Sequence, residues 1–182
     1  TMSYVVAWDK EGATDKAYMT ASGQQGIPTA FIVGKQGTVE WIGHPMEMDE
    51  VLAQVVDGKW DAKAYAEQQR IVQDLFKEFQ KAARSGDVEK LVAIAKQGAE
   101  KAPKQAGQMI MMAFDQQLAN GKVEAANAWA KELTTGAAKD DAMLLNGIAW
   151  GMVDPQRDLK GVDLDAALAA ATRANELGGN KD

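Results

Sequence analysis

The sequence predicts an α/β module followed by an all-α region. In the first 60 residues, short runs of β-branched and aromatic residues alternate with turn residues, which is typical of strands. From Asp61 onward, Ala, Gln, Lys and Glu dominate and apolar residues recur at spacings of three and four, which favours amphipathic helices. We therefore expect a first domain over residues 1–60 and a helical second domain over residues 61–182.

The first domain is predicted to have the element order β-α-β-β-α. Its strand formers are bounded by clusters of Gly, Asp, Lys and Glu that mark turns. Pro28 stands at the start of an apolar run, where a strand tolerates a missing N–H, and a cis X-Pro bond is the usual reason for a proline there. The expected elements are strands at 4–8, 29–33 and 38–43 and helices at 14–21 and 49–56.

The second domain is predicted to consist of helical hairpins. Gly, Pro and Asn residues interrupt its amphipathic segments and mark the helix ends. The expected helices cover residues 61–84, 87–101, 104–119, 122–134, 139–152 and 163–177.

An internal repeat runs through these helices. The segment after Gly86 matches the segment after Gly121 at an offset of 35 residues, and Leu75 falls on Ile110 at the same offset. A third, irregularly spaced copy begins at Asp163. A period of this length, with a glycine turn and an alanine-rich second helix, resembles tetratricopeptide-type repeats. An irregular helical bundle is the alternative.

The composition argues against several classes of function. Hydrophobic residues make up 46% and charged residues 25% of the chain, which is typical of a folded globular protein. The net charge of −6, with scattered Lys and Arg, argues against nucleic acid as a partner. No apolar run approaches the roughly 20 residues that span a bilayer. No cofactor is predicted.

Few residues have the pattern of a reactive or metal-binding site. The chain contains no cysteine, which excludes disulfides, thiolate nucleophiles and cysteine metal sites. His44 is the only histidine, and one imidazole makes neither a metal site nor a catalytic triad without partners. We expect residues 109–112 to be buried between helices. The same burial, in a core or an interface, is expected of Trp41, Trp60, Trp129 and Trp150. The sequence predicts no catalytic residue and no metal ligand.

The segment Gly26-Ile27-Pro28-Thr29 opens a strand, turn, strand, helix order in which Gly43 ends the second strand. This order resembles the C-terminal half of a thioredoxin-like domain of the thiol-disulfide oxidoreductase, thiol-specific antioxidant superfamily. The resemblance implies that Ile27 pairs with an extended substrate segment, that Pro28 is cis, and that Gly43 lets a partner approach. The candidate substrate-binding residues are thus Gly26, Ile27, Pro28 and Gly43. The alternative is that Pro28 only shapes the start of the strand.

The same resemblance implies a redox function that this chain cannot perform alone. Thioredoxin-like enzymes act through a Cys-x-x-Cys pair, and the chain has no cysteine. The first hypothesis is therefore a fragment of a bacterial thiol-disulfide oxidoreductase, redox-inactive by itself, whose central strand and cysteines belong to residues outside this sequence. Its partner would be a client protein or peptide with a disulfide, and the family's location would be periplasmic or otherwise extracytoplasmic. Whether a longer protein is an enzyme stays open.

Two other functions are left open by the sequence. One is a non-catalytic module in which a degenerate thioredoxin-like part holds extended peptides and the helical repeats present a second surface. The other is a structural helical adaptor whose β part self-associates through an exposed sheet edge. The residues specify neither the client nor the redox direction.

Overall fold

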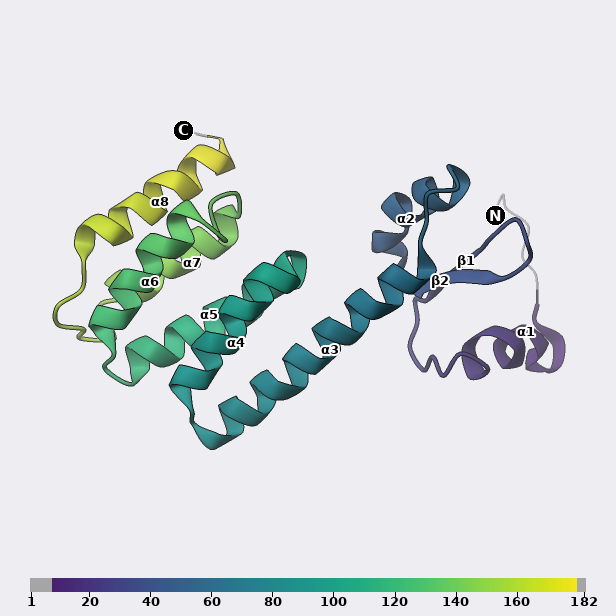
Figure 1. Ribbon diagram of the computed structural model, residues 1–182, viewed down its shortest axis with the longest axis horizontal. Helices are drawn as coiled ribbons and strands as arrows, with labels where there is room; N and C mark the ends of the chain where they lie inside the picture. Colours follow the sequence, from purple (N-terminus) through teal and green to yellow (C-terminus); the bar gives the residue numbers. More distant parts are fainter. Residues whose placement is uncertain (1–7, 180–182) are drawn as a thin grey trace, which may run out of the picture. The chain divides into compact units, whose positions relative to one another are not determined.

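The computed structural model describes residues 8–179, which fall into two compact units. The first unit ends at Tyr65 and the second begins at Ala66. Helix α3 (Ala62–Ser85) crosses this boundary (Figure 1). The domains expected over 1–60 and 61–182 stay a prediction, because compact units do not by themselves establish the identity of a domain.

β1 (Ala30–Val33) and β2 (Val39–Gly43) form a two-stranded antiparallel sheet in the first unit. The Gly34 N–H closes the turn between them by donating to the Thr38 carbonyl at 2.8 Å. The register shifts near this turn, so β2 carries one extra residue and bulges. The other elements of the unit are short: η1 (Lys10–Gly12), α1 (Ala13–Asp15), η2 (Lys16–Thr20), η3 (Pro45–Glu47) and α2 (Met48–Val56).

One face of this sheet carries the core of the first unit. Ile32 and Trp41 lie opposite each other in the register and are buried together with Val51 of α2. The indole N–H of Trp41 donates to the Tyr65 hydroxyl at 3.0 Å, which satisfies the polar atom of a buried ring. Burial of each large apolar side chain stabilises the unit by roughly 1.5–3 kcal/mol. This core therefore fixes which face of the hairpin points inward.

The second unit continues after α3 with five helices between Val88 and Gly178 (Figure 1). α4 packs against α5 and α7 packs against α8, while α5 also contacts α6 and α7. Phe114, Leu145 and Ile148 are each 0% exposed in the shared core. The helices are α4 (Val88–Lys101), α5 (Pro103–Ala119), α6 (Val123–Thr135), α7 (Ala142–Val153) and α8 (Leu164–Gly178).

Local side-chain signals explain where these helices begin and end. Asp87, Asp141 and Asp163 cap α4, α7 and α8, because each accepts a hydrogen bond from the backbone N–H three residues later. Gly86 and Gly121 have φ of +68° and +70° at the turns after α3 and α5, a conformation that glycine adopts without a steric penalty. The predicted limits of these helices agree with the observed ones to within three residues.

The predicted mixed class is confirmed, since a small sheet precedes an all-helical unit. The assignment to the C-terminal half of a thioredoxin-like domain followed by tetratricopeptide-like repeats is wrong. Residues 8–179 form a sheet of two strands, and the strand expected over 4–8 lies outside the described residues except for Trp8, which is irregular. A strand, turn, strand, helix pattern specifies a hairpin and a helix, and it leaves the pairing of further strands undetermined.

We expect Gly121→Ala to lower the free energy of unfolding by about 1 kcal/mol, because a Cβ is strained at positive φ. Gly107→Ala is the matched control: Gly107 lies inside α5, and its added Cβ would meet only the Asp141 carboxylate, at 3.9 Å. The control should raise stability by about 0.5–1 kcal/mol through helix propensity. Urea unfolding followed by circular dichroism measures both. Equal effects of the two substitutions would contradict the left-handed turn.

Candidate functional site

The segment before β1 presents an exposed apolar side chain. Ile27 is 92% exposed, and the peptide bond between Ile27 and Pro28 is cis. Pro28 is also exposed, and the Thr29 hydroxyl donates to the Gly26 carbonyl, which closes a small local turn. Three of the four predicted site residues therefore lie together, on the surface, at the start of β1.

Gly43 pairs with Ala30, the first residue of β1, and so lies at the end of the sheet where the segment before β1 enters. A Cβ at Gly43 would collide with the Trp41 ring, which lies on the same side of β2 two residues earlier. The glycine therefore makes room for the largest side chain of the core. This packing role was not predicted from the sequence, and the expected close approach of a partner at Gly43 stays a prediction.

The two strands differ in how their backbones are covered. On β2, the Glu40 carbonyl accepts a hydrogen bond from the Trp60 indole at 3.0 Å. β1 pairs with β2, and within residues 8–179 no second strand pairs with it. The backbone N–H and C=O groups of successive strand residues point to opposite edges of the strand. Because the Gly34 N–H points toward β2, the backbone groups of Phe31 and Val33 point to the other edge of β1. This edge has no strand partner within residues 8–179.

A groove of about 810 Å³ is lined by β1 and the residues that precede it. Trp8, Tyr18 and Phe31 form its apolar part, and the Tyr18 and Phe31 rings meet edge-on with centroids 5.2 Å apart. An adjoining cavity of about 440 Å³ shares Tyr18 and Phe31 and continues over Val33 and Val39, which are each 46% exposed. The sheet face opposite the core is thus an exposed apolar surface.

Carboxylates border this groove. Asp9 accepts hydrogen bonds from the backbone N–H groups of Thr14 and Asp15 at 2.9 and 3.0 Å, and these bonds hold the pKa of Asp9 below its ordinary value. Asp15 also lines the groove and accepts a hydrogen bond from the Thr20 hydroxyl at 3.3 Å. The groove therefore combines an apolar floor with a negatively charged border.

Sequence reasoning did not find the groove. Alternation along β1 was the available signal, because it places Phe31 and Val33 on the face opposite Ile32. The contribution of Tyr18 had no local signal, since it depends on how the chain between residues 13 and 30 returns to the sheet. The expected helix over 14–21 is instead the short pair α1 and η2.

The expected burial of apolar residues in the helical unit is correct in part. Met109 and Ile110 are 1% and 2% exposed, whereas Met112 is 44% exposed. Trp129 is 4% exposed, but Trp150 is 61% exposed on α7. Four adjacent apolar residues on a helix point in all directions, so one of them faces solvent unless a neighbouring helix covers every side.

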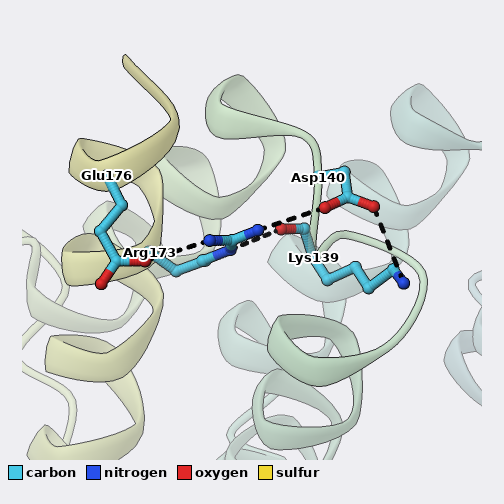
Figure 2. Close-up of polar contacts among 4 residues, drawn as sticks. All are labelled: Lys139, Asp140, Arg173 and Glu176. Carbon is cyan, nitrogen blue, oxygen red and sulfur yellow. Dashed lines mark hydrogen bonds and ion pairs between the residues drawn. The ribbon is translucent and has the colours of Figure 1, made fainter. Parts of the chain in front are cut away.

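The polar clusters of the second unit hold helices together. In Figure 2, the Arg173 guanidinium on α8 donates to the Lys139 carbonyl at 2.8 Å and lies 3.2 Å from Asp140 and 3.1 Å from Glu176. Lys139 makes a longer ion pair with Asp140, at 3.8 Å. Each charge in the cluster has a partner. The cluster therefore ties α8 to the loop before α7.

The remaining candidates for chemistry have structural partners. His44 accepts the Met46 N–H at its Nδ1, at 3.3 Å, and caps η3.

Across residues 8–179, no three His, Asp or Glu side chains gather as they would around a metal ion. In the same range, no helix has the length and apolar character needed to cross a bilayer.

Comparison with characterised proteins finds a partial similarity to Protein FixW of Rhizobium leguminosarum, a thioredoxin-like protein. The two sequences are 32% identical over 57 residues, which are 31% of this chain and 26% of FixW. The chain thus spans about a quarter of the length of this relative. No family model and no solved structure matches the chain. The similarity fits a thioredoxin-like origin of the matched segment. It covers too little of either protein to show that the chain belongs to the thioredoxin-like superfamily, and it gives no support for tetratricopeptide-like repeats.

The ion pair between Lys131 and Asp163 has the clearest electrostatic effect in the second unit. The Lys131 ammonium lies 2.6 Å from the Asp163 carboxylate and lowers the pKa of that carboxyl. The Ala166 N–H, which donates to the same carboxylate at the start of α8, lowers this pKa further. The same contact raises the pKa of Lys131. A carboxyl whose pKa is lowered by folding stabilises the protein above its unfolded pKa, and this contribution is lost as the pH falls.

We expect Asp163→Asn to destabilise the chain near neutral pH, because it removes the charge while keeping a side chain that can cap α8. The difference in unfolding free energy from the wild type should shrink as the pH falls below the ordinary aspartate value of 3.8. Urea unfolding between pH 7 and pH 3 measures it. A difference that stays constant over this range would refute the ion pair as its cause.

Proposed function

We propose that the first unit binds an extended polypeptide segment along the free edge of β1. The observation that carries the proposal is the exposed Ile27 side chain, which stands directly before a strand edge that has no partner within residues 8–179. An apolar anchor beside a row of free backbone groups is the combination that β-strand addition uses. The proposed binding residues at this edge are Gly26, Ile27 and Pro28, while Gly43 of β2 is proposed only as a point where a partner can approach the sheet.

The groove beside β1 supports a preference for particular side chains. Successive side chains of an added strand point to opposite faces of the sheet, so every second one would lie over Tyr18 and Phe31. Asp9 and Asp15 would favour a Lys or Arg there, because such a side chain can cover aromatic surface with its stem and reach a carboxylate with its head. We therefore propose a bound segment that alternates apolar and basic residues.

Ile27→Ser should weaken the binding of such a peptide by at least about tenfold, because full burial of an isoleucine is worth roughly 1.5–3 kcal/mol. Leu52→Ser is the control, since Leu52 is 39% exposed on α2, on an element outside the proposed site. Fluorescence anisotropy of a labelled peptide measures both. Hydrogen exchange at the Phe31 and Val33 amides should slow when the wild type is saturated. Equal losses in both variants, or unchanged exchange, would reject the site.

A second copy of the chain is the competing occupant of the same edge. In that case the chain would dimerise without peptide, with a mass that rises with concentration, and the slowed exchange at Phe31 and Val33 would follow protein concentration. Analytical ultracentrifugation of the wild type distinguishes the two. A stable monomer that still binds peptide supports the proposed function.

A second candidate function is client binding within a thioredoxin-like thiol-disulfide oxidoreductase, and the similarity to FixW favours it. The chain has no cysteine, so the attacking thiolate would come from residues outside this sequence. By itself the chain would be redox-inactive and would only hold the client. The extracytoplasmic location expected from the resemblance remains part of this proposal.

If the site serves disulfide exchange, the chain should bind a peptide with an internal disulfide more tightly than the same peptide with both cysteines replaced by serine. We expect a difference of several-fold, because the disulfide closes a loop in the peptide and so reduces the conformational entropy that the peptide loses on binding. Anisotropy titrations with the two peptides measure it. Equal affinities would favour the plain peptide-binding function over the redox one.

A further inference from the structure

The helical unit contains a cavity that none of the functions above uses. It is lined by residues of α3 and α5 and has a volume of about 270 Å³. Phe79 and Met109, which are 3% and 1% exposed, form its floor, and Phe76 and Met112 form part of its rim. This volume is close to the lower end of the roughly 300–1,000 Å³ of ligand pockets, which suits one large side chain better than a whole cofactor.

Arg84 is the charged residue that lines this cavity. It makes no hydrogen bond or ion pair with any residue in the range 8–179. The other three arginines each pair with a carboxylate: Arg70 with Glu67, Arg157 with Asp115, and Arg173 with Asp140. Its place in the last turn of α3 explains why a cation is tolerated there, but it does not explain the open apolar cavity beside it.

The rest of the lining suits a polypeptide. Gln80 and Gln108 line the cavity, and their side-chain amides have no hydrogen-bond partner within residues 8–179. A primary amide both donates and accepts, so it can bond to a peptide group of a bound chain. Met109 and Met112 are flexible and polarisable, which lets such a cavity adjust to aliphatic or aromatic side chains.

We propose that this cavity anchors an acidic segment of a partner polypeptide. The segment inserts one large apolar side chain between Phe76 and Met112 and places a neighbouring carboxylate against Arg84. Charge complementarity selects the sign, because Arg84 supplies a positive charge that has no carboxylate partner within residues 8–179, and the rest of the lining is uncharged. This site is separate from the proposed strand edge, and it favours a ligand of opposite charge.

The test uses a labelled peptide with a Leu or Phe beside Asp and Glu, and a second peptide in which Lys replaces the acids. The whole chain is titrated with each by fluorescence anisotropy at low and high salt. Arg84→Gln should weaken the acidic peptide about tenfold, and Arg84→Lys much less. The matched control is Arg70→Gln on the same helix, whose guanidinium already pairs with Glu67 at 2.8 Å. Ala83→Phe, which fills the cavity, should abolish binding at either salt concentration.

Each outcome decides the proposal. Preference for the acidic peptide, loss with Arg84→Gln and Ala83→Phe, and retention with Arg70→Gln support it. Equal binding of the basic peptide, or equal effects of the two arginine substitutions, overturns it. Binding of 8-anilinonaphthalene-1-sulfonate with no measurable binding of either peptide would also overturn it, since it would indicate a small-molecule cavity. Circular dichroism of each variant confirms that a loss does not come from unfolding.

Discussion

The burial of Trp41 is the constraint on which the first unit depends. Its ring is 3% exposed, fills the space above Gly43 and donates through its indole N–H to Tyr65. A ring of this size can be buried on only one face of a two-stranded sheet, and that face is the one that meets Val51 of α2. The side chains on the opposite face can therefore be covered only by the short helical segments α1 and η2.

The strand register carries this constraint to the candidate site. With Ile32 opposite Trp41, alternation turns Phe31 to the other face, where its ring meets the Tyr18 ring edge-on. The same alternation points the backbone of Phe31 away from β2. The exposure of Phe31 and the groove that it lines therefore follow from the burial of Ile32 and Trp41 on the other face of the sheet.

The parts of the fold that the sequence predicts well are those set by neighbours in the chain. Asp163 caps α8 and Gly121 turns the chain after α5 through interactions that reach three or four residues, so both were visible in the sequence. The thioredoxin-like assignment failed because it required pairing between distant strands, which a local order of elements does not determine. The exposed position of Trp150 had the same cause, since burial depends on which helices become neighbours.

The two proposed sites differ in charge, and this difference limits what each can bind. The groove beside β1 is bordered by Asp9 and Asp15, whereas the cavity lined by α3 and α5 is bordered by Arg84. In a chain of net charge −6, the cavity beside Arg84 is the less expected of the two, because this arginine has no carboxylate partner in the described part of the chain. A segment that alternates apolar and basic residues would be repelled by Arg84, and an acidic segment would be repelled by the two aspartates. The two sites would therefore select different segments without competing for one ligand.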